Sequence, residues 1–168
     1  MTEWRSVPGW GDSYRVSSAG EVRSVDRVIA TRIGPQRWKG RALKPFRPNA
    51  GKHNPYLAVR LSYEGQGGWR SIHSLVAAAF IGPRPEGLEV RHVDGDYLHN
   101  ATSNLVYGTT SENALDSVKH GTHFNSAKTF CPGNHPYNEA NTHIDKRGGR
   151  HCRKCITQHS RERRARAA

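Results

Sequence analysis

The sequence predicts an α+β protein built from short elements that many turns connect. Only 35% of its 168 residues are hydrophobic, and it contains 17 glycines and 9 prolines. The first part of the chain alternates polar and apolar positions, as small antiparallel strands do, whereas residues 73–80 and 110–120 have the spacing of short helices. A chain of this length suits one sizeable domain or a few small modules.

The charge of the chain is unevenly distributed. The net charge is +12, but residues 73–120 hold 3 Lys and Arg against 6 Asp and Glu, whereas residues 1–72 hold 13 against 5 and residues 121–168 hold 10 against 3. Basic arms suit a polyanion, because each neutralised phosphate releases condensed counterions. An acidic centre suits a site that holds a cation beside that polyanion.

Nothing in the sequence indicates a membrane protein or a membrane partner. No stretch approaches the roughly 18 consecutive apolar residues that cross a bilayer. The first residues, Met1–Arg5, contain no apolar signal core. We therefore expect a cytoplasmic protein.

The N-terminal part predicts strands first and then a basic loop. Residues 1–29 are expected to form two short antiparallel strands around a turn at Ala19-Gly20. Residues 30–55 are expected to be largely a loop, with a strand at 41–46 as an option, because Gly and Pro are frequent there. The cations of this loop alternate with aromatic side chains, which indicates phosphate contacts rather than a merely solvated loop. These cations are Arg32, Arg37, Lys39, Arg41, Lys44, Arg47 and Lys52.

A hairpin is expected next. Residues 56–61 alternate with period two and predict a strand, and residues 69–72 are expected to pair with it after a turn at 63–68. The hairpin carries Arg60 and Arg70, and a basic hairpin can lie in the major groove of DNA.

An apolar helix is predicted at His73–Phe80, because Leu75 and Ala79 share one face with their apolar neighbours. Gly82, followed by a proline, is expected to end this helix. We interpret His73 at its start as a structural residue that supports packing or a phosphate contact, not as a metal ligand.

Residues 90–120 predict a strand, a polar turn, a second strand and a helix. Asp94-Gly95-Asp96 has the composition of a turn, and residues 105–107 return as the second strand. The helix is expected to begin at a cap formed by Thr109, Thr110 or Ser111.

Three polar residues stand at marked places on this unit. His92 closes the first strand, Asn104 opens the second and Asn113 lies in the first turn of the helix. A histidine with a pKa near neutrality can take a proton from water, and amide oxygens are ligands for hard divalent cations.

This ordered set resembles the HNH nuclease motif, a ββα-metal finger, in the form found in phage and intron homing endonucleases. The preceding run of residues 72–80 strengthens the match. The first 27 residues resemble a modular motif that accompanies these nucleases at their N-terminus. The chain is thus expected to have a basic β region at 1–72, an HNH core at 73–120 and a third module at 121–168.

The resemblance implies an endonuclease that hydrolyses DNA phosphodiester bonds with Mg²⁺ or Mn²⁺. It assigns the general base to His92 and the metal ligand to Asn113, and it implies that Asn104 anchors the hairpin loop and fixes the tilt of His92. The expected partner is double-stranded DNA, bound by a monomer without a small-molecule cofactor. If a phage encodes the protein, its compartment would be the bacterial cytoplasm.

One position departs from the family pattern. Many members have an aspartate that binds the metal immediately before the catalytic histidine, but this chain has Arg91. Asp116 shares a helix face with Asn113 and could supply the missing ligand, and Asp94 is a further option. Arg91 could instead contact a DNA phosphate. The alternative interpretation is a weakly active or inactive HNH-fold protein that only binds DNA.

The third module contains all three cysteines. Cys131, Cys152 and Cys155 cannot form a closed disulfide framework, because their number is odd. Together with His135 they predict a tetrahedral Zn²⁺ site that is structural, since four protein ligands leave no open position. His143 and His151 are weaker candidates for the fourth ligand.

The residues from Cys155 onward predict a basic helix that would follow DNA phosphates. Its candidate contacts are Arg161, Arg163 and Arg164.

Overall fold

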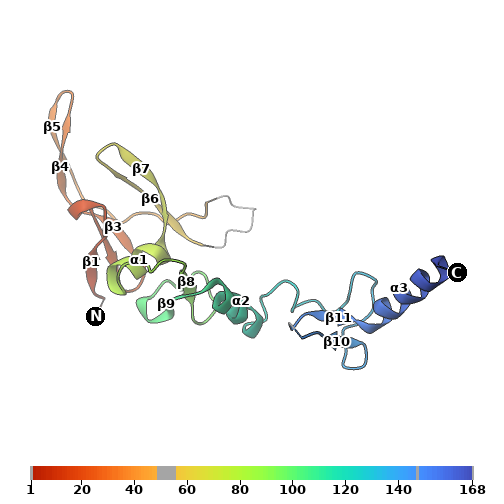
Figure 1. Cartoon of the computed structure of the whole chain (residues 1–168). Coiled ribbons are helices and arrows are strands. Elements are labelled where there is room, and N and C mark those ends of the chain that lie inside the picture. Colours follow the sequence, from red (N-terminus) through yellow and green to blue (C-terminus); the bar gives the residue numbers. More distant parts are fainter. Residues whose placement is uncertain (1, 49–55, 147, 168) are drawn as a thin grey trace. The chain divides into compact units, whose positions relative to one another are not determined.

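The computed structural model describes residues 2–48, 56–146 and 148–167. The chain forms two compact units, residues 1–120 and residues 121–168, and short helices and antiparallel strands make up both (Figure 1). The predicted α+β class is therefore confirmed. Within the described ranges, no helix is long and apolar enough to cross a membrane.

The first unit begins with a small antiparallel sheet of three strands in the order β1-β2-β3. The strands are β1 (Trp4–Ser6), β2 (Tyr14–Ser17) and β3 (Val22–Ser24), and a short 3-10 helix, η1 (Gly11–Ser13), precedes β2. The predicted hairpin around Ala19-Gly20 is present, since β2 pairs with β3. Gly20 in its turn has a positive φ of 91°, which favours glycine.

A second hairpin, β4 (Arg27–Thr31) with β5 (Gly34–Trp38), lies where the sequence predicts mainly loop. That prediction is wrong for residues 30–38. The alternation that normally reveals a strand is missing, because both faces of the hairpin are largely exposed; the side chain of Val28 is 67% exposed. The optional strand at 41–46 reduces to single bridges at Ala42 and Phe46.

The third hairpin pairs β6 (Ala58–Tyr63) with β7 (Gln66–Ser71) as predicted. Its turn is shorter than expected: Glu64 and Gly65 alone connect the strands, both at positive φ, as a two-residue hairpin loop requires. In Figure 1, β4–β5 and β6–β7 extend as two narrow arms from the body of the unit.

One hydrophobic core joins the predicted β region to the predicted nuclease core. Helix α1 (Ile72–Phe80) packs on strands β1, β2 and β7 and also contacts the pair β8–β9. The shared core consists mainly of branched aliphatic side chains: Val7, Val16, Val22, Val59, Leu61, Ile72, Leu75, Val76, Val90 and Leu105. Residues 1–72 and 73–120 are therefore parts of one compact unit.

The predicted ββα unit follows α1. Strand β8 (Glu89–His92) pairs with β9 (Leu105–Gly108), and helix α2 (Thr110–Lys119) comes next. A short 3-10 helix, η2 (Thr102–Asn104), precedes β9. Of the three candidate caps Thr109 is the one used, because its side chain accepts from the backbone N–H of Glu112 and forms a capping box with it.

The second unit has little regular structure. Strands β10 (Thr142–Ile144) and β11 (Arg150–Cys152) form a hairpin, and helix α3 runs over Arg153–Arg166. The helix begins two residues before the predicted start, because the Cys152 side chain accepts from the backbone N–H of Cys155 and caps it. None of the described residues of α3 is buried.

Candidate active site and metal group

His92 lies at the end of β8, where its ring is enclosed by other rings. It is stacked on Tyr56 with 5.9 Å between centroids, and the rings of His73 and Tyr97 lie edge-on at 5.4 Å and 6.0 Å. Only 4% of the residue is exposed. The enclosure fixes the position of the imidazole.

Asn100 determines which ring nitrogen of His92 carries the proton. The Asn100 Nδ2 atom donates to the Leu98 carbonyl at 3.0 Å, so Oδ1 is the atom that faces His92 Nε2 at 3.2 Å. An amide oxygen can only accept a hydrogen bond, so a neutral His92 has its proton on Nε2. Nδ1 is then the nitrogen with the basic lone pair.

The surroundings of His92 favour the neutral ring. Burial lowers its pKa below 6.5, and the hydrogen bond that its Nε2 donates to Asn100 and the charges of Asp94 and Asp96 only partly offset this effect. Burial also lowers the pKa of His73 to about 4, with a smaller contribution from His92. Both imidazoles are therefore uncharged at neutral pH.

Asn104 is buried and ties the hairpin loop together, which is one of the two roles expected for it. Its Oδ1 atom accepts from the backbone N–H of Asp94 at 3.0 Å. Its Nδ2 atom donates to the Asp94 carboxylate at 2.8 Å and to the His99 carbonyl at 2.9 Å. The contact with the His92 ring itself comes from Asn100, a residue that the sequence did not single out.

The first hairpin of the chain supports Asn100 from outside the ββα unit. A Cβ atom on Gly20 would lie 2.9 Å from the Cβ of Asn100, so only glycine permits this approach. The backbone N–H of Thr102 donates to the Ser18 carbonyl at 2.9 Å nearby. The N-terminal region therefore helps to position the residue that orients His92.

Asn113 lies in the first turn of α2, as predicted, and contacts Glu89 of β8. Its Nδ2 atom donates to Glu89 Oε2 at 3.1 Å. The amide oxygen of Asn113 forms no hydrogen bond within the described residues, so an oxygen ligand remains on this side chain. No hydrogen bond of the described chain joins Asn113 to His92.

Arg91 of β8 forms ion pairs with two acidic residues of α2. Its Nε and Nη2 atoms both contact Asp116 Oδ2, at 2.9 Å and 2.6 Å, and Nη1 lies 3.3 Å from Glu112 Oε2. The guanidinium lies so close to the backbone of Gly108 that a Cβ there would overlap it. Asp116, a predicted metal ligand, is thus neutralised by Arg91 in this structure.

The predicted DNA contacts are mostly exposed cations of the first unit. Arg32 and Arg37 lie on the β4–β5 arm and Arg60 and Arg70 on the β6–β7 arm. The exposed residues Lys39, Arg41, Lys44 and Arg47 lie between the arms in sequence. Lys52 lies outside the described residues. In the second unit Arg161, Arg163 and Arg164 are exposed on α3.

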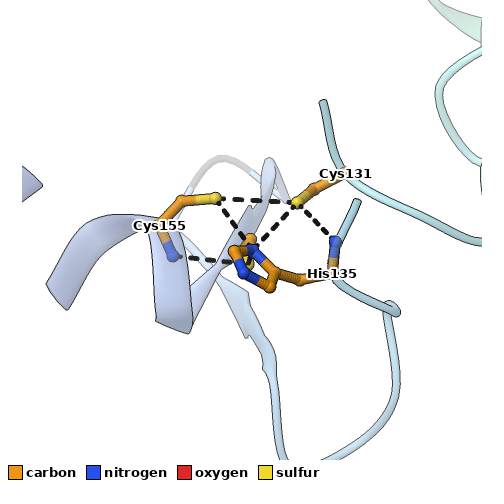
Figure 2. Close-up of side chains that lie close together, drawn as sticks. Cys131, His135 and Cys155 are labelled. Carbon is orange, nitrogen blue, oxygen red and sulfur yellow. Dashed lines mark hydrogen bonds between the residues drawn. The ribbon is translucent and has the colours of Figure 1, made fainter. Parts of the chain in front are cut away.

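The second unit brings Cys131, His135, Cys152 and Cys155 together, with all four ligand atoms within 4.8 Å of one another. His135 Nδ1 lies 3.6 Å, 3.7 Å and 3.4 Å from the three sulfurs in that order. Figure 2 shows Cys131, His135 and Cys155 pointing toward one another. The group can hold a metal ion, and neither His143 nor His151 belongs to it.

The loop and helix around this group present the ligands. Gly133 allows close approach, because a Cβ there would lie 3.1 Å from the Cys155 sulfur. Buried Asn141 donates to the Cys152 sulfur at 3.3 Å. Burial raises the pKa of Cys152, but hydrogen bonds from the Cys155 backbone, Asn141 and the neighbouring thiols outweigh it and lower the pKa to about 6.

The fold and the polar residues of the first unit define a ββα nuclease-type unit attached to an N-terminal β region. Two family models match them: residues 3–62 match the NUMOD4 motif and residues 70–115 match the HNH endonuclease family. The chain thus matches the NUMOD4 motif and, after it, the HNH endonuclease family, which confirms the resemblance seen in the sequence.

Known relatives agree with this assignment. DNA endonuclease I-HmuI of Bacillus phage SP01 is 32% identical over 120 residues, which are 71% of this chain and 60% of that protein. An uncharacterized HNH endonuclease of Acanthamoeba polyphaga mimivirus, L245, is 27% identical over 145 residues, or 86% of this chain and 37% of that protein.

A solved structure also matches. It concerns DNA binding and cleavage by the HNH homing endonuclease I-HmuI, and it aligns with a TM-score of 0.54 at 32% identity over 71% of this chain and 60% of that one. The chain therefore spans 60% or less of the length of these relatives.

Proposed function

We propose that the protein is a metal-dependent endonuclease that hydrolyses phosphodiester bonds of double-stranded DNA, of the phage or homing type. The observation that carries the proposal is the state of His92. It is buried and neutral, with its proton directed to Asn100 and its Nδ1 lone pair left to act as a base.

In the proposed reaction His92 Nδ1 takes the proton from the attacking water. Asn100 and the surrounding rings hold the imidazole in place, so little reorientation is required when the proton arrives. Asn104 keeps the loop between the two strands closed. These contacts are independent of any bound ion.

Asn113 is the residue that would hold the divalent cation, through its amide oxygen. The potential metal-ligand atoms at this place are oxygen atoms, which suit Mg²⁺ or Mn²⁺. When bound, such a cation neutralises charge on the scissile phosphate and on the leaving oxygen. An amide is a weak ligand, so water and the DNA phosphate would complete the coordination.

The basic arms support the choice of DNA as the substrate. The cations of β4–β5, β6–β7 and α3 project into solvent, and exposed aromatic side chains, Trp38 and Trp69, lie among them. This combination suits backbone contacts with some groove entry. We propose a single copy of the chain on its DNA.

The ion proposed for the Cys and His group is Zn²⁺. In a tetrahedral Zn²⁺ site, Zn–S bonds of about 2.3 Å and Zn–N bonds of about 2.0–2.1 Å place the ligand atoms roughly 3.5–3.8 Å apart. The sulfur–nitrogen distances of 3.4–3.7 Å and the 3.6 Å between the Cys131 and Cys155 sulfurs fit that geometry. Four protein ligands make the site structural.

A second candidate function, DNA binding without cleavage, is favoured by the ion pair between Arg91 and Asp116. Arg91 is a cation at the position where the HNH pattern that the sequence resembles commonly has an acid, and it occupies the carboxylate of Asp116.

A plasmid-nicking assay separates the two functions. The wild type should nick supercoiled DNA with Mg²⁺, and His92→Ala should lower the rate by about 100- to 10,000-fold while the affinity for DNA is retained. The control is His99→Ala, which removes a half-exposed imidazole that contacts Asp94 at the rim of the same loop. A wild type that binds DNA but cuts with no divalent cation would leave only the second function.

A further inference from the structure

Glu89 connects the start of β8 to the first turn of α2. Its Oε1 atom accepts from the Thr110 hydroxyl at 2.9 Å, and its Oε2 atom accepts from Asn113 Nδ2 at 3.1 Å. The residue is partly buried between the strand and the helix. Both carboxylate oxygens are therefore engaged by the helix that presents the candidate cation ligand.

The contact determines which end of the Asn113 amide is available. Only the oxygen of an amide can bind a cation, and an ionised carboxylate can only accept hydrogen bonds. Turning the amide over would bring Asn113 Oδ1 against Glu89 Oε2, two acceptors with no proton between them. Glu89 therefore keeps Nδ2 toward itself and leaves Oδ1 for another partner.

The strand geometry explains why Glu89 occupies this place. Successive side chains of a strand alternate between faces, so residues 89 and 91 lie on the same face of β8, toward α2. At position 91 this chain has an arginine, and Arg91 binds Asp116 and Glu112. The carboxylate that contacts Asn113 is the one two residues earlier, on Glu89.

We propose that Glu89 is a positioning residue that orients the Asn113 amide so that Oδ1 faces a divalent cation, and that its negative charge strengthens cation binding. The proposal rests on the proposed function, in which Asn113 holds that cation. Hydrogen-bond partners of a metal ligand commonly change metal affinity by about 10- to 100-fold when they are removed.

The first measurement is the dependence of plasmid nicking on Mg²⁺. Glu89→Ala should raise the Mg²⁺ concentration for half-maximal rate by about 10- to 100-fold, whereas the rate at saturating Mg²⁺ should stay within about threefold of the wild type, because the base is intact. The Mg²⁺ requirement of Glu89→Gln should lie between those of the wild type and Glu89→Ala, since the glutamine amide oxygen can still accept from Asn113 but carries no charge. Glu86→Ala, which removes an exposed acid nearby, should match the wild type.

The second measurement does not depend on cleavage. Zinc-loaded His92→Ala protein bound to duplex DNA should take up one Mn²⁺, measured by electron paramagnetic resonance, and the double variant with Glu89→Ala should bind it about 10- to 100-fold more weakly.

The two measurements separate the failure of this proposal from that of the proposed function. An unchanged Mg²⁺ requirement in an active Glu89→Ala enzyme, or unchanged Mn²⁺ binding in the double variant, would overturn the role of Glu89. A wild type that does not cut, but whose DNA complex binds Mn²⁺ with an affinity that falls when Glu89 is replaced by Ala, would overturn the activity alone. A complex that binds no Mn²⁺ would overturn both.

Discussion

The ββα unit and the Cys and His group both present candidate metal ligands, but different forces hold their ligands in place. In the ββα unit protein contacts position the three candidate site residues: Asn100 orients His92, Glu89 orients Asn113, and Asn104 closes the loop. The second unit has almost no hydrophobic core: of its described hydrophobic residues, only Cys131 and Cys152 are buried.

The difference indicates two uses of metal in one chain. The ββα unit shares the core of the first unit, so its fold should persist without a cation. The ion proposed there serves catalysis and not folding. The second unit has few apolar contacts to offset the loss of chain entropy on folding. The ion proposed there is therefore part of the folded structure.

Removal of zinc should have the largest effect on stability, and it should unfold the second unit while the first unit stays folded. Structural Zn²⁺ sites contribute on the order of 10 kcal/mol to the folding of small modules, so chelation is expected to unfold residues 121–168. All four tryptophans lie in the first unit, so their fluorescence should be unchanged while the helical circular dichroism of α3 is lost. Cys152→Ser should reproduce this state without a chelator.

A matched control is His143→Ala, since His143 lies outside the ligand group on β10. That variant should retain one zinc per chain after dialysis. If chelation left the circular dichroism unchanged, or if the metal content of Cys152→Ser equalled that of the wild type, the second unit would not depend on zinc.

A moderate effect is expected from acid on the first unit, through His73. The imidazole takes its proton near pH 6.5 in the unfolded chain but only at about pH 4 in the folded one. The contribution of neutral His73 to the unfolding free energy is therefore fully present above pH 6.5. It falls as the pH is lowered toward 4, because the unfolded chain binds the proton first. A shift of this size corresponds to about 3 kcal/mol.

His73→Phe should remove this part of the pH dependence and keep the ring contact with Tyr56. Urea unfolding followed by tryptophan fluorescence, at several values between pH 4 and 7, measures it. The variant should show a smaller loss of unfolding free energy toward pH 4 than the wild type. Equal slopes would mean that burial of His73 does not control its protonation.

The sequence could indicate where three polar residues lie on the ββα unit, because each of these places depends on local order. His92, Asn104 and Asn113 stand at the ends of elements, where turn composition and periodicity are informative. The ligand group of the second unit was likewise visible, because Cys152 and Cys155 have a spacing that directs both sulfurs to one ion.

The partners of these residues could not be predicted, because they come from tertiary contacts. Asn100 lies within a polar turn, and its approach to Gly20 joins segments 80 positions apart in sequence. Glu89 precedes the motif and contacts a helix through two hydrogen bonds. The β4–β5 hairpin was missed for a different reason: its exposed faces carry no hydrophobic alternation.

The smallest effect tests whether local contacts alone hold the helix of the ββα unit. The Thr109 hydroxyl accepts from the backbone N–H of Glu112 at 3.2 Å, and the Glu112 carboxylate accepts from the backbone N–H of Thr109 at 2.7 Å. Thr109→Ala should lower the unfolding free energy of the first unit by about 1 kcal/mol, whereas Thr109→Ser keeps the hydroxyl and should lose little. Both should retain wild-type zinc content, because the cap lies in the unit that requires no ion to fold. Tryptophan-monitored urea unfolding measures the first effect and metal analysis the second; equal losses in both variants would show that the cap hydroxyl does not stabilise α2.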